Sequence, residues 1–462
     1  MAKRRLRGVR CIHTHLKDEA LSQDDLTDLA ILRLDLMAAL GVGSNGLPGN
    51  IYIAHLIPPN PDGNTYKLIE KIIFHKLDLN LSDFLQDIDE EIALSHEGID
   101  IEKRDRAVIV SVSLKKRTEQ EDSLEELKEL AKTAGVIVLD SIIQRPKEIH
   151  PKYLMGEGKI KELIIKSLQK DANLIIFDQN LSPTQVKSIG DFTDLRVIDR
   201  TQLILDIFAR HAYSRDGKVQ VELAQLKYLL PRLVGTGRAL SRLAGGIGGR
   251  GPGEMKLEID RRRIRDRITH LERELEHLSR ARRQRKERRV IIQIPIVSIV
   301  GYTNAGKSTL LNSLTRSNVR TEDILFATLD TASRRLRFPR EREVIITDTV
   351  GFIKELPEDL FGAFRATLDE LRDAHLLLHV VDISNPRFEQ QMFSVEKILR
   401  ELGLDHIPVL LVFNKMDKTD QEEVKILCQR FNATAISAIK PETLIPLLAL
   451  MEERIWCTSN NI

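Results

Sequence analysis

The chain has 462 residues and a formal net charge of only +2, so it is long enough to hold about three domains with a sizeable core. Its three cysteines, Cys11, Cys428 and Cys457, show no C-x-x-C spacing, which argues against a disulfide framework and a zinc site and fits a reducing cytoplasm. The basic start leads into residues 11–15 and not into an apolar segment, and no apolar run approaches ~18 residues, so we expect neither a signal peptide nor a membrane span.

Residues 1–100 mix two kinds of pattern and contain no recognisable chemical motif. Apolar runs at 50–57 and 68–74 predict strands, whereas the spacing over 24–40 predicts a helix. We therefore expect a small α/β extension, to which the sequence assigns no role.

Residues 105–212 alternate strands and helices more regularly, which indicates a parallel sheet covered by helices. Ser123 followed by Glu126 has the signature of a capping box that opens a helix, and Gly135 is placed to end it. The loop Gly156–Lys159 precedes a further helix but lacks the full glycine frame, so it is either a nucleotide site or a plain loop. The predicted strands are 107–114, 136–139, 174–177 and 195–198, and the other predicted helices are 159–169, one from Pro183, and 201–209.

Residues 215–290 contain two short heptad seams, which predict an antiparallel helical hairpin. Pro231 lies inside the first seam and should kink or end that helix. The other interpretation is a pair of amphipathic helices that pack elsewhere. The seam residues are Val219, Leu223, Leu226, Leu230 and Leu233, followed by Ile264, Ile268, Leu271, Leu275 and Leu278.

The predicted hairpin has a glycine-rich tip and a basic second helix. Residues 235–253 include eight glycines, a density that cannot pack a core, and such a long connection is usually functional or disordered. Residues 261–289 hold twelve Arg and one Lys against five acidic residues, which favours a polyanionic partner over a solvated face. No aromatic residue lies between Tyr228 and Tyr302, which favours folded RNA or duplex over single strands. The candidate RNA contacts are Arg238, Arg242, Arg250, Arg282, Arg283, Arg285, Arg288 and Arg289.

A phosphate-binding loop begins the last region, residues 294–456. Gly301–Ser308 reads G-x-x-x-x-G-K-S between an apolar run that suits a buried strand and a segment that suits a helix. Backbone N–H groups of such a loop curl around a phosphate, and the helix N-terminus adds partial positive charge. Lys307 would reach the β- and γ-phosphates, and Ser308 would give its hydroxyl to Mg²⁺.

Two further tetrapeptides follow predicted strands in the order that a guanine-nucleotide site needs. Asp348–Gly351 supplies a carboxylate that can hold Mg²⁺ through water and an amide that can sense the γ-phosphate. Asn414–Asp417 supplies a carboxylate that matches the N1–H and 2-amino donors of guanine, a pair that adenine lacks. Ser437 and Ala438 would close over the base from the other side. Together these motifs resemble the guanine-nucleotide-binding domain of translation-factor-like GTPases.

The order of the parts resembles the HflX-type GTPases over about residues 105–455. Local matches to that family are 153–159, 221–226, 245–253 and 325–330. The resemblance implies an α/β protein in which a P-loop GTPase domain is joined by the helical hairpin to an N-terminal parallel α/β domain. It also implies action on the ribosome, because family members bind the large subunit and some split stalled ribosomes.

The resemblance also places Thr328 in switch I, where it would close on Mg²⁺ and the γ-phosphate. After Asp330, many relatives have a Pro and paired Thr where this chain reads Thr331–Arg334. The predicted catalytic residues are Lys307, Thr328 and Gly351, and the predicted Mg²⁺ ligands are Ser308, Thr328 and, through water, Asp348. The predicted GTP contacts are Gly301, Tyr302, Thr303, Asn304, Ala305, Gly306, Lys307, Ser308, Thr309, Phe326, Ala327, Thr328, Leu329, Asp330, Asp348, Thr349, Val350, Gly351, Asn414, Lys415, Met416, Asp417, Ser437, Ala438 and Ile439.

Phe352 stands where Ras-type GTPases have a Gln that orients the attacking water. A phenyl ring cannot do this and is either core or a hydrophobic gate, so we expect slow hydrolysis that a partner accelerates by ordering the switches. The sequence thus predicts a monomeric, cytoplasmic, Mg²⁺-dependent GTPase that binds GTP and GDP. The resemblance implies that it also binds the large ribosomal subunit and dissociates or rescues stalled ribosomes. Two alternatives stay open: a GTP-gated RNA-binding factor in subunit assembly, and ATP-driven RNA remodelling by the N-terminal domain.

Overall fold

The computed structural model describes residues 8–58, 60, 64–78, 80–97, 104–193, 195–233, 252–290, 294–315, 332–338, 342–349, 351–352 and 369–457. The chain divides into two compact units, Met1–Leu203 and Ile204–Ile462. Within the described ranges, no helix is both long and apolar enough to cross a membrane.

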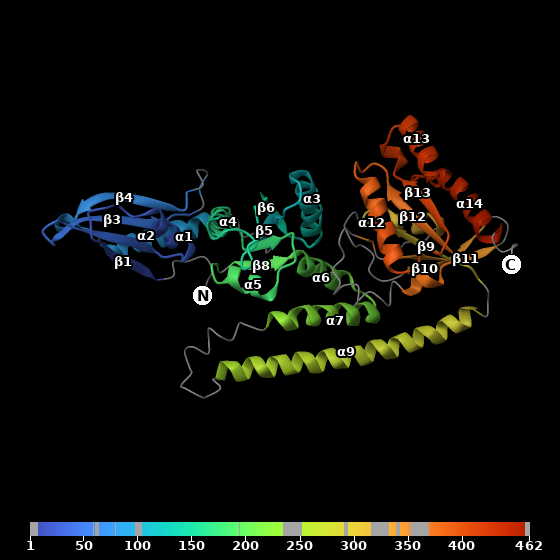
Figure 1. Ribbon diagram of the computed structural model, residues 1–462, viewed down its shortest axis with the longest axis horizontal. Coiled ribbons are helices and arrows are strands. Elements are labelled where there is room, and N and C mark those ends of the chain that lie inside the picture. Colours follow the sequence, from blue (N-terminus) through green and yellow to red (C-terminus); the bar gives the residue numbers. More distant parts are fainter. Residues whose placement is uncertain are drawn as a thin grey trace. The chain divides into compact units, whose positions relative to one another are not determined.

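The first unit begins with a four-stranded sheet in the order β1-β2-β3-β4, in which only β1 and β2 run parallel. Alternate residues of the central strand β2 point to opposite faces. Met37 and Ala39 join the core under α1, whereas Leu36 and Ala38 join the core under α2, so helices cover both faces (Figure 1). The elements are β1 (Arg10–His15), α1 (Gln23–Ile31), β2 (Leu36–Val42), β3 (Pro48–Leu56), β4 (Tyr66–Ile73), the short 3-10 helix η1 (Phe74–Lys76) and α2 (Leu81–Glu97).

The helix predicted over 24–40 is wrong in its second half, because α1 ends at Ile31 and residues 36–42 form β2. Leu, Met and Ala favour helices in isolation, and this run shows no polar alternation that would reveal a strand. A strand that is covered on both faces is apolar throughout, so burial outweighs local helix propensity here. The strands predicted at 50–57 and 68–74 are confirmed as β3 and β4.

A second sheet in this unit has the order β6-β5-β7-β8 and is parallel throughout, as the alternation of strands and helices predicts. Val110 and Phe177 lie in the core that α4 and α5 complete, while α3 packs against β5 and β6. The elements are β5 (Arg106–Val112), α3 (Arg117–Thr133), β6 (Ile137–Gln144), α4 (Glu157–Gln169), β7 (Leu174–Phe177), α5 (Pro183–Gly190), β8 (Arg196–Asp199) and α6 (Arg200–His211), the last of which runs into the second unit.

The predicted start of α3 at Ser123 is wrong, because the helix begins at Arg117 and Ser123 lies inside it. The earlier start is stabilised by a buried glutamine and not by a short N-cap side chain. The amide of Gln120 donates hydrogen bonds of 3.2 Å to the carbonyls of Ser113 and Lys115, in the segment just before the helix. A capping-box search does not detect this arrangement.

The second unit contains the predicted antiparallel hairpin, formed by α7 (Arg215–Arg232) and α9 (Pro252–Val290), which lie side by side in Figure 1. Val219 and Leu223 of α7 are buried against Leu271 of α9, so the two seams face each other. Two interhelical ion pairs show the antiparallel direction, because Arg215 at the start of α7 pairs with Glu274, whereas Glu222 farther along α7 pairs with Arg267, which comes earlier in α9. The interpretation in which the helices pack elsewhere is therefore wrong. Helix α7 ends one residue after Pro231, as the proline predicts.

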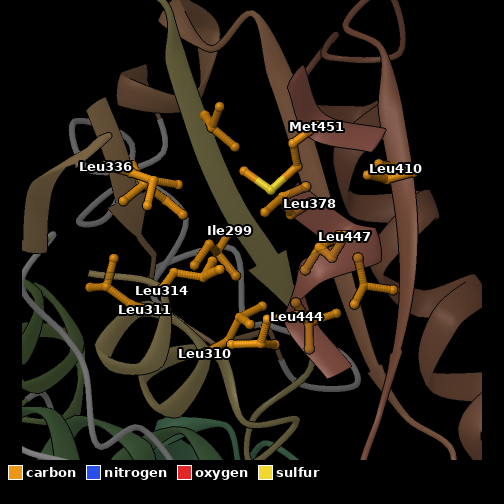
Figure 2. Close-up of a cluster of buried hydrophobic side chains, with 14 of the residues drawn as sticks. Ile299, Leu310, Leu311, Leu314, Leu336, Leu378, Leu410, Leu444, Leu447 and Met451 are labelled. Atoms are coloured by element: carbon orange, nitrogen blue, oxygen red, sulfur yellow. The ribbon is translucent and has the colours of Figure 1, made fainter. Parts of the chain in front are cut away.

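The last region of the chain, from Ile296 onward, forms a six-stranded sheet in the order β10-β11-β9-β12-β13-β14, parallel except at β10. One face packs against α10 and α14, as Figure 2 shows for Ile299, Leu310 and Leu447, and the other face packs against α12 and α13. Carboxyl ends of parallel strands meet at one edge, which places the three nucleotide motifs together. The elements are β9 (Ile296–Gly301), α10 (Lys307–Thr315), β10 (Ala332–Arg337), β11 (Glu343–Asp348), η2 (Asp369–Asp373), β12 (Leu376–Asp382), α12 (Phe388–Glu401), β13 (Val409–Asn414), η3 (Met416–Lys418), α13 (Gln421–Phe431), β14 (Thr434–Ala435), η4 (Pro441–Thr443) and α14 (Leu444–Cys457).

Candidate functional site

The phosphate loop links Gly301, the last residue of β9, to Lys307, the first residue of α10. Asn304 and Gly306 have φ angles of 60° and 90°, a left-handed turn of the kind that exposes backbone amides to an anion. A Cβ on Gly306 would lie 2.3 Å from Nδ2 of Asn414, so glycine is needed where this loop meets the base-reading motif. The backbone of this loop therefore suits a phosphate, and the loop packs directly against the base-reading motif.

Lys307 supplies a buried cation to this loop. Its side chain is buried, and Nζ donates a hydrogen bond of 2.8 Å to the Tyr302 carbonyl. Burial lowers the pKa of Lys307 to about 8, although the nearby Asp348 carboxylate opposes that shift. A Cβ on Gly351 would lie 2.9 Å from Nζ, so the amine sits directly against this glycine. An amine, a glycine backbone and a helix N-terminus thus converge, which suits a terminal phosphate group.

Ser308, the second residue of α10, lies beside Asp348, the last residue of β11. Ser308 Oγ donates a hydrogen bond of 2.6 Å to Oδ2 of Asp348. Hydroxyl and carboxylate oxygens are ligands that Mg²⁺ accepts while it keeps several of its waters. The two oxygens therefore fit the magnesium site that the sequence predicts. When bound there, Mg²⁺ would neutralise charge on the β- and γ-phosphate oxygens.

Phe352 belongs to the core, and its backbone is hydrogen-bonded to the phosphate loop. Its side chain is buried, its N–H donates to the Gly301 carbonyl over 3.1 Å, and its carbonyl accepts from the Thr303 N–H over 2.8 Å. These bonds hold the loop through the backbone, so of the two interpretations the structure supports core over gate. An attacking water must be positioned by another residue or by a partner.

Asn414 organises the base-reading motif at the end of β13. Its Nδ2 donates to the Ala305 carbonyl, and its Oδ1 accepts from the Ala438 N–H, both over 2.9 Å. The amide thus ties the phosphate loop to the loop after β14. Ser437 Oγ donates to Oδ1 of Asp417 over 2.6 Å, and this bond lowers the pKa of the exposed Asp417 carboxyl, against a smaller opposing effect of desolvation. The site therefore presents an oriented, ionised carboxylate, as guanine recognition requires.

Asp382 is a member of this site that sequence reasoning missed. Lys415 has a left-handed backbone, with φ of 63°, and its Nζ lies 2.7 Å from Oδ2 of Asp382 at the end of β12. The ion pair holds the lysine whose stem is predicted to lie along the base. The sequence did contain a signal for Asp382, because this residue follows an apolar run just as Asp348 does.

His379, also on β12, is buried beside the phosphate loop. Burial together with the charge of Lys307 lowers the pKa of His379 to about 4, so this ring is neutral at neutral pH.

The remaining predicted residues have varied positions. Thr349 is buried and donates to the Ile299 carbonyl over 2.7 Å, so its hydroxyl supports the strands, whereas Ile439 is 69% exposed. Ser313, which was not predicted, donates to the Ala438 carbonyl and supports the base-side loop. The candidates Phe326, Ala327, Thr328, Leu329, Asp330, Val350, Arg238, Arg242 and Arg250 lie outside the described residues. For Arg282, Arg283, Arg285, Arg288 and Arg289 the structure describes only the helical backbone of α9.

The described part of α9 carries basic side chains of two kinds. Arg267 and Arg280 are held by carboxylates, those of Glu222 and Glu276 respectively. A second group is exposed and has no carboxylate within ion-pair distance among the described side chains; it comprises Arg262, Arg265 and Arg273. Positive charge on this helix therefore exceeds what its own acidic partners neutralise.

The loop Gly156–Lys159 lacks the backbone of a phosphate nest. Gly156 has φ of −62° and caps α4 in an ordinary extended conformation, in contrast to the left-handed turn at Gly306. Lys159 forms an ion pair with Glu162 on the exposed surface of the same helix. These features favour the plain-loop interpretation.

Three family models match successive parts of the chain. Residues 121–209 match "GTP-binding GTPase N-terminal", residues 211–289 match "GTP-binding GTPase Middle Region", and residues 296–415 match "50S ribosome-binding GTPase". The matched segments follow the order of the second sheet, the hairpin and the nucleotide site.

Curated relatives span most of the chain. The protein named GTPase HflX from Caldanaerobacter subterraneus subsp. tengcongensis is 51% identical over 314 residues, which cover 68% of this chain and 73% of the relative. GTPase HflX from Escherichia coli (strain K12) is 45% identical over 322 residues, which cover 70% and 75%. A solved structure of a GTP-binding protein from Sulfolobus solfataricus in complex with GDP is 26% identical and covers 75% of this chain and 99% of its own, with a TM-score of 0.40.

Proposed function

The chain belongs to the HflX family of GTPases, and from that premise we propose that it hydrolyses GTP on the large ribosomal subunit and thereby dissociates or rescues stalled ribosomes. Nucleotide binding and GTP hydrolysis are the family's activities. The proposal adds the partner, the work done on it, Mg²⁺ as the metal, and a monomer that acts in the cytoplasm.

The nucleotide site supports a reaction that waits for a partner. Lys307, Ser308 and Asp348 converge at one edge of the sheet, so phosphate and metal binding need little rearrangement. The side chain of Phe352 cannot orient the attacking water, because a phenyl ring has no hydrogen-bonding atom, and this ring is buried. Hydrolysis should therefore be slow alone and faster when a bound partner orders the remaining loops.

The excess positive charge of α9 is the single observation that carries the choice of an RNA partner. The helix has 39 residues, which corresponds to a rod of about 58 Å, and exposed arginines recur along it. Such a rod can contact many phosphates without reading bases. The match of residues 296–415 to a family described as 50S ribosome-binding points to ribosomal RNA.

Co-sedimentation with ribosomes and with separated subunits tests the proposal directly. We expect binding to large subunits with a non-hydrolysable GTP analogue, weaker binding with GDP, and GTP turnover that large subunits stimulate many-fold. Small subunits at equal concentration are the control. Equal binding to both subunits, or none, would contradict the assigned partner.

The buried Phe352 also favours a second candidate, a GTP-gated RNA-binding factor in subunit assembly for which turnover is incidental. The two candidates separate on one measurement. Unchanged turnover in the presence of large subunits, with nucleotide-dependent binding retained, supports the assembly factor and excludes the splitting enzyme.

The tip of the hairpin is the region that we expect to act on the subunit. Replacing Gly237–Pro252 with a short Gly/Ser linker should preserve folding and intrinsic GTPase activity, because a shorter connection costs less entropy to close. Splitting of ribosomes, followed by light scattering, should be abolished, while stimulation of hydrolysis should fall less completely. If the shortened protein splits ribosomes as fast as the parent, the active surface lies elsewhere.

A further inference from the structure

Three side chains with metal-binding atoms converge in the first sheet, in a region that the proposed function does not use. His13 and His15 alternate along β1, so both point to the same face of the strand. Asp25 comes from the first turn of α1, which packs over that face. The cluster therefore depends on the fold of residues 10–31 and not on a contiguous motif.

The distances among the three side chains match those between ligands of one ion. Nε2 of His13 lies 3.0 Å from Nε2 of His15. Oδ1 of Asp25 lies 3.5 Å from Nε2 of His13, and Oδ2 of Asp25 lies 3.5 Å from Nε2 of His15. The ligand atoms all lie within 4.8 Å of one another. Tetrahedral ligands bound at 2.0–2.1 Å lie about 3.4 Å apart, so the three atoms need little movement to share a metal.

Two of the three ligands, His15 and Asp25, are oriented by hydrogen bonds to partners outside the cluster. Nδ1 of His15 lies 3.0 Å from the Glu19 carbonyl, and because a carbonyl only accepts, this nitrogen carries the proton and leaves the Nε2 lone pair toward the cluster. Oδ2 of Asp25 accepts hydrogen bonds of 2.8 Å and 2.7 Å from the N–H and hydroxyl of Ser22. Such outer partners typically accompany histidine and carboxylate ligands of metals.

The cluster is partly shielded from water. The exposed fractions of the His13, His15 and Asp25 side chains are 30%, 20% and 22%. Burial raises the pKa of the Asp25 carboxyl, but the hydrogen bonds from Ser22 oppose this effect, and the net pKa lies below its usual value. Cys11 lies 3.9 Å from Nδ1 of His13, on the edge of the ring that faces away from the cluster.

We propose that His13, His15 and Asp25 bind a divalent transition-metal ion, and that this ion is Zn²⁺. Two imidazoles and one carboxylate suit Zn²⁺ and Fe²⁺ better than Mg²⁺, and the Irving–Williams order favours Zn²⁺ over Fe²⁺. Three protein ligands leave a further coordination position, as in zinc sites that hold a water or a substrate. This inference does not rest on the proposed ribosomal function.

The test is Zn²⁺ binding by the full chain, held with excess Mg²⁺ and GDP so that the nucleotide site is saturated. Equilibrium dialysis with elemental analysis should give one tightly bound Zn²⁺ per chain, and Co²⁺ should give the visible spectrum of a low-symmetry nitrogen–oxygen site. The paired variant His13→Gln, His15→Gln should lower the Zn²⁺ affinity by at least about 100-fold. Asp25→Asn, which retains a capping side chain, should lower it by at least about tenfold.

A matched control is His75→Gln, which removes an exposed histidine of the same unit away from the cluster and should leave Zn²⁺ affinity unchanged. Circular dichroism and GTP turnover equal to those of the parent would show that the variants fold. A proton shared by the two imidazoles is the other arrangement that these distances allow. A parent chain without tight Zn²⁺, or a double variant that binds Zn²⁺ as the parent does, would overturn the site. Tighter retention of Fe²⁺ than Zn²⁺ under anaerobic conditions would overturn the choice of metal.

Discussion

In our interpretation the nucleotide site and the hairpin both bind polyanions, but the first uses buried and oriented groups whereas the second uses exposed positive charge. At the nucleotide site, Lys307 and Asp348 are buried, and backbone bonds fix the surrounding loops. On α9, the arginines are numerous and exposed, and Arg262, Arg265 and Arg273 lack carboxylate partners among the described side chains. One region thus relies on a few oriented groups and the other on charge density.

This difference determines how each region should respond to change. A buried charge interacts strongly and is little screened by salt, so removal of a single group should have a large effect. Exposed charges act together and are screened, so their effects should be distributed and dependent on salt. Mutations in the two regions can confirm or break this contrast.

The largest effect is expected at Lys307. Lys307→Ala removes the buried side-chain cation of the phosphate loop, and we expect GTP hydrolysis to fall by at least about 100-fold at every salt concentration. The measurement is single-turnover hydrolysis with and without large subunits. Lys418→Ala, which removes an exposed lysine of the same unit, is the control and should retain activity. Normal turnover by Lys307→Ala with subunits present would contradict the assignment of the phosphate loop.

The next effect concerns the choice of base. Asp417→Asn replaces an acceptor carboxylate that Ser437 orients, and we expect GTP affinity to fall by more than about tenfold, or over ~1.4 kcal/mol, while affinity for XTP rises. Competition binding with a fluorescent nucleotide measures both. Asp420→Asn is the matched control, because Asn still caps α13 and should preserve GTP affinity. Equal preference for GTP and XTP in the parent would place base recognition elsewhere.

The contrast also explains what the sequence could predict. Motifs at Gly301–Ser308, Asp348 and Asn414–Asp417 are read correctly as following strands because a buried strand requires an apolar run directly before a polar turn. Their convergence follows from parallel topology. The partners that orient them are not encoded locally: Ser437 meets Asp417, and Asp382 meets Lys415, only through pairing of distant strands.

The N-terminal extension shows the complementary failure. The argument against a zinc site considered cysteines only, whereas the proposed ligands are two histidines and an aspartate. The His-x-His pattern of β1 was visible in the sequence, but Asp25 joins the two histidines only because α1 packs over β1. This packing depends on the pairing of β1 with β2, and the helix predicted over 24–40 replaced β2. An error in one element thus concealed the spatial relation of three residues.

The hairpin should show a smaller, salt-dependent effect. Replacing Arg282, Arg283, Arg285, Arg288 and Arg289 with Gln should weaken large-subunit binding several-fold at physiological salt and flatten the dependence of log affinity on log salt by roughly one for each phosphate that an arginine no longer neutralises. Nucleotide affinity should not change. Arg267→Gln is a control, because this side chain is already held by Glu222 and should alter the slope little. If the slope of log affinity against log salt is the same in the fivefold variant as in the parent, these arginines do not contact phosphates and this part of α9 is a solvated face.

The smallest effect expected is a pH dependence, and it arises from the burial of Lys307. Burial lowers the pKa of this amine to about 8, whereas a bound triphosphate stabilises the charged form and raises it again. Well below pH 8 the Lys307 amine is charged before and after binding, so GTP affinity should be nearly constant there. Above pH 8 binding must take up a proton, so GTP affinity should fall as pH rises, by about threefold between pH 7.5 and 8.5.

Calorimetry in two buffers of different ionisation enthalpy measures this proton uptake. At pH 8 we expect uptake of about half a proton per GTP bound, because half of the Lys307 amines are then neutral. Salt should leave the uptake almost unchanged, since the buried amine is shielded from counterions, whereas binding through α9 should weaken with salt. Lys418→Ala should show the same uptake as the parent. Binding without proton uptake near pH 8 would mean that Lys307 stays charged without nucleotide. Burial would then not alter the charge of this amine, and Lys307 would not differ electrostatically from the exposed arginines of α9.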